Sequence, residues 1–314
     1  MILPNTIDTV RKAANLLTKG RLVAFPTETV YGLGADATSD EAVAKIFEVK
    51  NRPSFNPLII HLAEASDVEK LAIMTQAAKL LADAFWPGPI SLVLRRTNHC
   101  PVSFLASAGL DTVAVRVPSH PIAKLILEES KIPIAAPSAN ISGKVSPTTA
   151  KHVLDSLGPQ LNLIVDSGPC EIGLESTVVD CTQEKPAILR PGGVTYEELI
   201  KVLGALENRE TDRQAPIAPG TMESHYAPSA TIRMNANHAK VGEGLLAFGP
   251  EIHSNKNNKF NLSPEGNLVE AAANLFSMIR KLDQEYNKIA VMPIPNHGLG
   301  IAINDRLQRA AAAR

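Results

Sequence analysis

Short apolar runs alternate with helical segments in the first two thirds of the chain, and this alternation limits the fold more than any other feature. Residues 22–25, 58–60 and 132–136 are too short for helices and are typical of buried strands. The polar stretch 26–34 follows the first run directly and is predicted to be a loop. In open α/β sheets, ligands bind where such loops leave the strands. We therefore predict an α/β fold whose polar loops converge on one rim of a sheet.

Capping signals locate two helices near these loops. Thr38 and Glu41 have the spacing of a capping box, which predicts a helix that begins near Ser39. Ser146, followed by proline, is predicted to cap a second helix that runs to about residue 157.

A change in composition divides the chain. Residues 207–220 are charged and proline-bearing and show no apolar period, so they predict a linker. A second α/β unit follows, in which residues 264–285 carry a strong amphipathic helical pattern. The predicted segments are a larger domain at 1–206, a linker at 207–229 and a smaller domain at 230–314.

Charge and composition argue against several classes of protein. The 31 basic and 32 acidic residues leave a net charge of −1, and aromatic residues make up 4%, so nucleic acid is not expected as the main ligand. Three cysteines without C-x-x-C spacing favour a reducing cytoplasm over a disulfide framework or a zinc site. Neither a signal peptide nor a membrane span is predicted.

Residues 50–61 join the end of a helix to a buried strand, and they carry the clearest chemical signal. Lys50 and Arg52 suit a polyanion such as a nucleotide triphosphate. Two prolines stiffen the loop between them and the strand, so its polar groups can be held in place before a ligand binds. A solvated helix end, whose cations favour the negative C-terminal dipole, is the alternative.

Further cations, hydroxyls and amides lie near the ends of other predicted strands. They are Thr27, Thr29, Asn56, His61, Arg116, Ser138, Asn140, Ser176 and Arg190. No phosphate-binding G-x-x-x-x-G-K-[ST] loop, H-E-x-x-H or G-x-S-x-G motif accompanies them. Such a set favours chemistry by positioning and charge neutralisation, as in nucleotidyl transfer. Individually, His61 could be a satisfied core histidine, Ser138 and Asn140 turn formers, and Glu28 and Glu175 surface carboxylates.

Seven segments together form a specific pattern. They are Pro-Thr-Glu-Thr-Val-Tyr-Gly-Leu at 26–33, Lys50-x-Arg52, Ser138-x-Asn140, Glu-Ser-Thr-Val-Val-Asp at 175–180, Arg-Pro-Gly at 190–192, His-Tyr-Ala-Pro at 225–228 and Gly-Ile-Ala-Ile-Asn-Asp-Arg at 300–306. This pattern resembles the YrdC-type family in its long, two-domain form. The resemblance implies a twisted, mixed open sheet with flanking helices, followed by a smaller, Rossmann-like α/β domain.

The resemblance also implies an activity, that of an L-threonylcarbamoyladenylate synthase. Such a nucleotidyltransferase converts L-threonine, bicarbonate (or CO2) and ATP into L-threonylcarbamoyl-AMP and pyrophosphate. The product supplies the threonylcarbamoyl group of N6-threonylcarbamoyladenosine at position 37 of tRNA. The implied cofactor is Mg²⁺, bridged by the ATP phosphates without protein ligands. The implied partner is a separate tRNA threonylcarbamoyl transferase in the cytoplasm, with at most weak contact to tRNA and none to a membrane.

Carried over residue by residue, the resemblance assigns two sets of contacts. The residues implied for ATP are Lys50, Arg52, Asn56, Thr112, Ser138, Asn140, Ser146, Arg190 and Tyr226. The residues implied for threonine are Thr29, His61, Arg116 and Ser176. Lys50 and Arg52 are expected to be catalytic, by stabilising charge on the phosphates and the departing pyrophosphate. His225 and Tyr226 lie on the predicted linker, which suggests that the linker covers the site as a lid.

Three other interpretations remain open at this point. A double-stranded RNA or tRNA-binding module would have to bind despite the balanced charge. An ATP-sensing regulatory protein would bind nucleotide without turnover. A hydrogenase-maturation carbamoyltransferase would need cysteine-rich zinc motifs, which three scattered cysteines do not supply.

Overall fold

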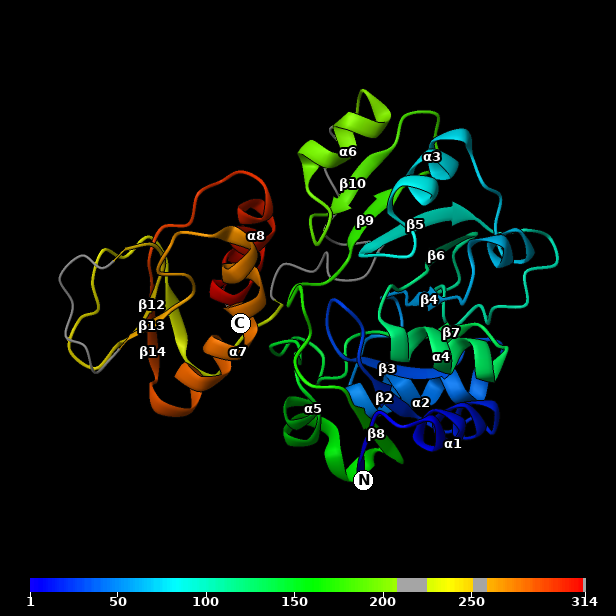
Figure 1. The fold of residues 1–314 in the computed structure, drawn as a ribbon, viewed down its shortest axis with the longest axis horizontal. Helices are drawn as coiled ribbons and strands as arrows, with labels where there is room; N and C mark the ends of the chain where they lie inside the picture. Colours follow the sequence, from blue (N-terminus) through cyan, green and yellow to red (C-terminus); the bar gives the residue numbers. More distant parts are fainter. Residues whose placement is uncertain (208–224, 251–258, 313–314) are drawn as a thin grey trace.

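The computed structural model describes residues 1–207, 225–250 and 259–312. These residues form two α/β units, one around a ten-stranded sheet and one around a four-stranded sheet (Figure 1). The smaller unit turns its helices toward the larger one (Figure 1). Most of the predicted linker, 208–224, lies outside the described residues, so the predicted segment boundaries stay a prediction.

The large sheet is mixed and open. Its strands, in spatial order, are β1 (Ile2–Pro4), β8 (Leu163–Asp166), β2 (Val23–Phe25), β3 (Gly32–Asp36), β7 (Ile134–Ala135), β4 (Ile59–His61), β6 (Thr112–Arg116), β5 (Ile90–Arg95), β9 (Thr177–Asp180) and β10 (Ala187–Arg190). Parallel pairs such as β4–β6 stand beside antiparallel pairs such as β5–β6. The predicted mixed sheet is therefore confirmed.

Helices flank this sheet on both sides. They are α1 (Ile7–Thr18), α2 (Asp40–Lys50), α3 (Gln76–Phe85), α4 (Pro121–Ser130), α5 (Ala150–Leu157) and α6 (Tyr196–Leu203), with short 3₁₀ turns at Ala65–Lys70 and Gly158–Gln160. Helices α1 and α4 cover one face, where Leu17 and Ile126 pack on Phe25. Helix α2 covers the other face, where Ile46 packs with Leu33. Burial of these apolar stripes stabilises the unit.

The smaller unit has an all-parallel sheet. Its strands, in spatial order, are β11 (Thr231–Arg233), β14 (Lys288–Val291), β12 (Gly244–Ala247) and β13 (Lys259–Asn261). Helices α7 (Leu268–Glu285) and α8 (Leu299–Ala311) lie beside it. This arrangement confirms the predicted smaller Rossmann-like domain.

Strand β3 overlaps the end of the stretch predicted as a loop, at residues 32–34. Gly32 and Gly34 pair with Phe25 and Val23 of β2. A Cβ at Gly34 would lie 2.7 Å from a ring carbon of Phe25, so the strand needs glycine where the sequence pattern would expect an apolar side chain. The loop prediction was therefore wrong at residues 32–34, because the glycines that the close packing of β3 requires give no apolar pattern. Residues 26–31 lie outside the strands and helices, as predicted.

Two capping predictions also need correction. Ser39, not Thr38, caps α2, while the Thr38 hydroxyl donates to the Asp36 carboxylate at 2.7 Å. Helix α5 begins after Thr149 rather than after Ser146. Ser146 does not cap the helix because its hydroxyl donates to Glu175, and a tertiary contact outweighs the local capping preference.

One hydrophobic core joins the two units. Val30, Val145 and Leu174 of the larger unit pack in the same cluster as Leu275 and Phe276 of α7. Arg280 of α7 also donates hydrogen bonds to the backbone carbonyls of Val145 and Ser146. The smaller unit is therefore docked on the larger one through buried apolar and polar contacts.

Gly173 packs closely against helix α7 of the smaller unit, which yields a test. A Cβ at Gly173 (φ +72°) would lie 2.6 Å from the Cα of Ala273 in α7, whereas a Cβ at Gly168 (φ +79°) would meet nothing within 4 Å. We expect Gly168→Ala to lower the free energy of unfolding by about 1–2 kcal/mol, because alanine is strained in a left-handed backbone conformation. Gly173→Ala should cost about 1–3 kcal/mol more through overpacking. Denaturant unfolding measures the difference, and equal losses in the two variants would contradict the close docking.

Candidate active site

A pocket opens where strand ends and loops of the larger unit meet His225 and Tyr226. His61 ends β4, Arg116 ends β6 and Arg190 ends β10. The predicted site residues that line the pocket are Thr29, Lys50, Arg52, His61, Arg116, Ser138, Asn140, Ser176, Arg190 and Tyr226. The fold thus brings together groups that are far apart in the sequence.

Three predicted residues do not line this pocket. Ser146 is joined to it by its 2.5 Å hydrogen bond to Glu175, which does line it. Asn56 is fully buried, and its backbone carbonyl accepts from the Nε of Arg52 at 3.1 Å. Thr112 lies at the opposite end of β6 from Arg116, about 13 Å along an extended strand. Their contact with ATP stays a prediction.

Lys50 fixes the loop that follows β7. Its ammonium donates to the carbonyl oxygens of Ser138 at 2.6 Å and Asn140 at 2.5 Å. An ammonium has three N–H donors, so a third can reach a ligand. Burial, and then the charge of Arg52, lower the pKa of Lys50 well below its ordinary value. An anion in the pocket would oppose both effects.

Arg52 and Arg190 add two more buried guanidinium groups. Arg52 also donates to the carbonyl of Pro57 at 2.9 Å, and Arg190 donates to the carbonyl of Ser176 at 2.8 Å. Burial, and then the charge of Arg190, lower the pKa of Arg52 to about 9. Carbonyl dipoles orient each cation. Because a carbonyl group carries no net charge, this side of the pocket stays positive.

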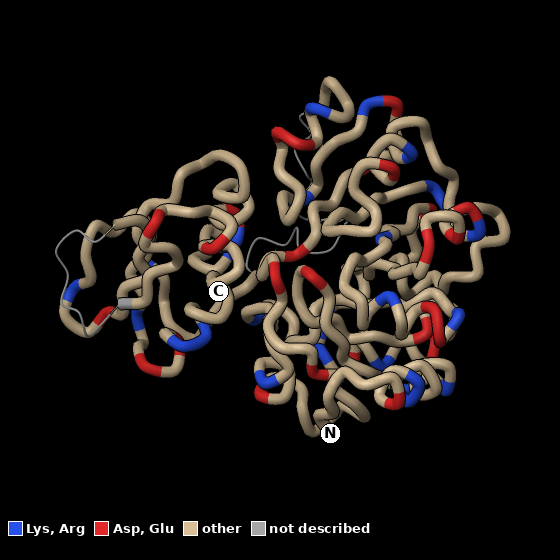
Figure 2. The backbone as a smooth tube through the Cα atoms, viewed as in Figure 1, with Lys and Arg blue, Asp and Glu red and all other residues tan. Residues whose placement is uncertain are grey.

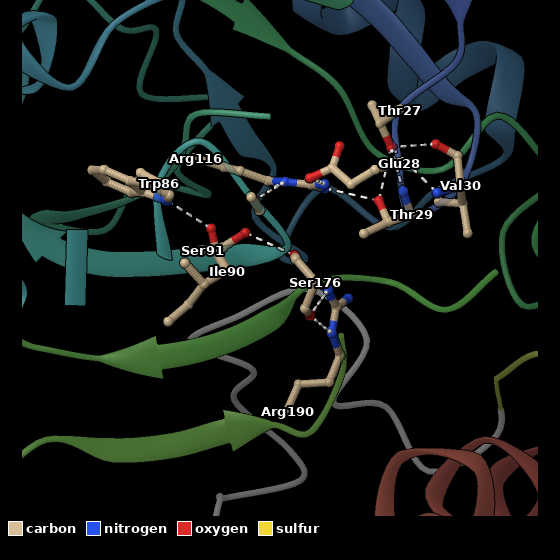
Figure 3. Close-up of polar contacts among 11 residues, drawn as sticks. Thr27, Glu28, Thr29, Val30, Trp86, Ile90, Ser91, Arg116, Ser176 and Arg190 are labelled. Atoms are coloured by element: carbon tan, nitrogen blue, oxygen red, sulfur yellow. Dashed lines mark hydrogen bonds and ion pairs between the residues drawn. The ribbon is translucent and has the colours of Figure 1, made fainter. Parts of the chain in front are cut away.

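The opposite side of the pocket is organised around Arg116 (Figure 3). Its guanidinium donates to Glu28 at 2.6 Å, to the hydroxyl of Thr29 at 2.9 Å and to the carbonyl of Gly88 at 3.3 Å. Burial would raise the pKa of Glu28, but the charge of Arg116 and its hydrogen bond outweigh it and lower that pKa. Arg116 is thereby held in one orientation by an ionised partner.

A turn that is held by the hydroxyl of Thr27 positions Thr29 for its contact with Arg116. The hydroxyl of Thr27 donates to the carbonyl of Val30 at 2.7 Å and accepts from the backbone N–H groups of Thr29 and Val30 (Figure 3). It also lies 2.8 Å from the hydroxyl of Thr29. Local side-chain bonds of this kind hold a turn without a helix or strand.

Ser176 lies between the two sides (Figure 3). Its hydroxyl is 2.8 Å from that of Ser91 and also accepts from Arg190 at 3.3 Å. Ser91 is fully buried in β5 and was not predicted, because a serine inside an apolar strand gives no chemical pattern by itself. Lys50, Arg52 and Arg190 form the cationic side of the pocket. The contacts from Arg190 through Ser176 to Ser91 link this side to the one that carries Arg116.

Several buried polar atoms of the pocket lining remain available to a ligand. Asn140 Oδ1, His225 Nδ1 and the hydroxyl of Tyr226 make no hydrogen bond within the described part of the chain. Buried polar groups in proteins are normally satisfied, so these atoms fit a polar ligand. Among the described residues, no three His, Cys, Asp or Glu side chains are grouped to hold a metal ion. The donor set therefore fits a metal carried on a phosphate ligand better than a metal bound by carboxylates.

Comparisons with known proteins agree with this geometry. Residues 15–192 match the Sua5–YciO–YrdC family, described as telomere recombination, and residues 194–312 match the threonylcarbamoyl-AMP synthase C-terminal domain. The threonylcarbamoyl-AMP synthase of Pyrococcus abyssi is 42% identical over 97% of this chain and 94% of its own length. The chain belongs to the threonylcarbamoyl-AMP synthase family. The predicted YrdC-type resemblance, in its two-domain form, is thus confirmed.

Two further members support the assignment to the synthase family. The Bacillus subtilis threonylcarbamoyl-AMP synthase is 40% identical over 97% of this chain and 93% of its own length. The crystal structure of Pyrococcus abyssi Sua5 complexed with L-threonine superposes with a TM-score of 0.89 at 39% identity, covering 99% of this chain and 97% of that chain. Within the described residues of this synthase-family chain, helices long and apolar enough to cross a membrane are absent.

Buried histidines make the stability of this synthase-family fold depend on pH. Burial, and then the charge of Arg116, lower the pKa of His61 from 6.5 to about 3. The unfolded chain therefore binds a proton below about pH 6.5 that the folded chain does not. Because of His61, the free energy of unfolding should fall by about 1.4 kcal/mol for each pH unit between about pH 6 and pH 4. Above about pH 6.5, His61 should no longer lower it.

The slope of unfolding free energy against pH tests this. His61→Gln should flatten the slope below pH 6 by one proton, whereas the control His99→Gln changes an exposed side chain. An unchanged slope in His61→Gln would contradict the assignment.

Proposed function

We propose that the chain catalyses the synthesis of L-threonylcarbamoyl-AMP and pyrophosphate from L-threonine, bicarbonate (or CO2) and ATP. The observation that carries the proposal is the juxtaposition in one pocket of two subsites. Arg116 and Thr29 suit an amino-acid carboxylate, and Lys50, Arg52 and Arg190 suit a triphosphate. This reaction is a nucleotidyl transfer.

Arg116 is well placed to hold threonine. A guanidinium has five N–H groups, and the contacts to Gly88, Thr29 and Glu28 use one on each nitrogen. One N–H on each terminal nitrogen remains for a carboxylate. Glu28 and Thr29 fix the plane of the guanidinium. The hydroxyl of Ser176 and the ring of His61 complete the proposed threonine subsite.

Carbamate formation requires a neutral threonine amine. A desolvated pocket beside Arg116 lowers the pKa of a bound ammonium, which favours the neutral form. With CO2, the amine nitrogen bonds to the carbon and one amine proton leaves to solvent. With bicarbonate, the same bond forms and that proton leaves together with a hydroxyl group of bicarbonate as water. The pKa of His61, about 3, makes its ring a poor proton acceptor, so we assign it a hydrogen-bonding role rather than that of a general base.

Adenylate formation follows in line. A carbamate oxygen bonds to the α-phosphorus of ATP as the bond to pyrophosphate breaks, and the electron pair leaves with pyrophosphate. Lys50 and Arg52 stabilise the charge that develops on the phosphates. Mg²⁺ that enters with ATP would supply further charge neutralisation. Asn56, Thr112, Ser138, Asn140, Ser146, Arg190 and Tyr226 are proposed to hold the rest of the nucleotide.

The remaining proposals concern water and partners. His225 and Tyr226 are buried in the pocket, which supports a role for the linker as a lid that keeps water from the labile adenylate. A separate transferase would pass the threonylcarbamoyl group to adenosine 37 of tRNA. The three cysteines are free, in keeping with a cytoplasmic location.

Pyrophosphate release from ATP tests the reaction. Release should require L-threonine and bicarbonate together, and Lys50→Ala and Arg52→Ala should lower it roughly 100-fold or more. The control is Lys45→Ala, which removes a surface ion pair with Glu41 from the same helix. Saturable ATP binding without threonine-dependent pyrophosphate would instead indicate a sensor or an RNA-binding module.

The division into subsites has its own test. Arg116→Gln should raise the KM for threonine roughly tenfold or more, the effect of losing about 1.4 kcal/mol of binding, while the KM for ATP changes less than about twofold. Arg11→Gln, an exposed arginine on α1, is the control. A larger effect on ATP than on threonine would refute the assignment of Arg116.

A further inference from the structure

Arg306 of the smaller unit reaches the wall of the pocket in the larger unit. It lies on α8 and is the last residue of the motif at 300–306. Its side chain is completely buried. Burying a guanidinium costs several kcal/mol unless its donors are satisfied, so the partners of Arg306 indicate why the chain keeps it there.

The first partner is Glu175, a carboxylate of the pocket lining. Its Oε2 accepts from Arg306 Nε at 2.9 Å, and its Oε1 accepts from the hydroxyl of Ser146 at 2.5 Å. Burial would raise the pKa of Glu175, but the charges of Arg306 and then Arg190 outweigh it and lower that pKa. Glu175 is therefore an ionised bridge between Arg306 and a residue of the proposed ATP subsite.

The second partner is the backbone that follows Arg190. Arg306 Nη2 donates to the carbonyl of Pro191 at 2.9 Å. The adjacent Gly192 packs tightly on the segment of Glu175, because a Cβ there would lie 2.4 Å from the carbonyl oxygen of Glu175. Arg306 thus holds both segments of this contact, one next to Arg190 and one next to Ser176.

The third partner is the ring of Tyr226. The Arg306 guanidinium lies 5.0 Å from the ring centroid, and Phe276 of α7 stacks on the same ring at 5.6 Å. Tyr226 has a positive φ of 60°, a strained conformation for a non-glycine residue that persists only where its surroundings stabilise it. The contacts of Arg306 and Phe276 with the ring of Tyr226 help to stabilise this conformation.

We propose that Arg306 is a positioning residue for the nucleotide: through Glu175, Pro191 and Tyr226 it holds the ATP side of the pocket in its binding geometry. The smaller unit thereby contributes to the reaction without touching the substrates. The inference rests on the proposed function for the identity of the nucleotide. Asp305, which accepts from Arg306 Nη1 at 2.5 Å, keeps the guanidinium oriented from its own helix.

The test compares two arginines of the smaller unit, each of which pairs with a glutamate. Arg306→Gln breaks the pair with Glu175, and Arg233→Gln breaks the pair between Arg233 and Glu243, neither of which lines the pocket. We expect Arg306→Gln to raise the Kd for ATP, measured by calorimetry, and the KM for ATP roughly tenfold or more. The KM for threonine should change less than about twofold, and Arg233→Gln should change neither constant.

Two further variants protect the test against a loss of folding. Arg306→Lys keeps the charge but not the planar fork, so it should fold and bind ATP with intermediate affinity. In the double variant Glu175→Gln with Arg306→Gln, no unpaired buried carboxylate remains, so ATP affinity should recover part of the loss seen in Arg306→Gln alone.

Three outcomes would overturn the proposal. They are equal increases in the KM values for ATP and threonine, a lowered melting temperature with unchanged ATP affinity in both Arg306 variants, or strictly additive effects in the double variant. A wild-type chain that binds ATP without threonine-dependent pyrophosphate release would refute the proposed function alone. The ATP affinities would still decide the role of Arg306.

Discussion

The pocket depends on the burial of more cations than carboxylates. Its walls and their immediate support contain Lys50, Arg52, Arg116, Arg190 and Arg306 against Glu28 and Glu175, all of them buried. The carboxylates neutralise Arg116 and Arg306, whereas Lys50 and Arg52 lie against backbone carbonyl oxygens. Carbonyl dipoles orient a cation without cancelling its charge, so a positive excess remains in a water-poor site. A polyanionic ligand would relieve that excess, which supports the proposed triphosphate subsite.

The same arrangement separates two tasks within one pocket. Arg116 is fixed by an ionised partner and presents a fork of defined direction, as carboxylate recognition requires. The cationic side presents charge from two segments, the end of α2 with the loop that follows it (Lys50 and Arg52) and the end of β10 (Arg190), which suits the proposed triphosphate. Ser176 contacts Ser91 on one side of the pocket and Arg190 on the other. A displacement of one side would therefore shift Ser176 and, through it, the other side. The proposed adenylation needs the carbamate oxygen and the α-phosphorus in line, and shared contacts of this kind would hold the two subsites in a fixed relative position.

The smaller unit is part of this organisation rather than an appended domain. Tyr226 and Phe276 belong to a core that includes Val30 and Leu174 of the larger unit. Glu175 and Tyr226, which contact Arg306, also line the pocket. Burial of a shared core makes the docking of the two units and the geometry of the site a single cooperative feature.

The resemblance to a known family implied the mixed sheet. The sequence by itself determined the alternation of strands and helices, the presence of a second α/β unit, and most pocket-lining groups. These are local properties, since apolar periods and polar loops at strand ends can be read residue by residue. Only the tertiary structure decided that Ser146 leaves its capping role for Glu175, that β3 forms from a glycine-rich stretch, and that Ser91 and Arg306 support the pocket. The reason is that each of these depends on a partner from a distant segment, whose proximity is set by packing and leaves no periodic trace in the sequence.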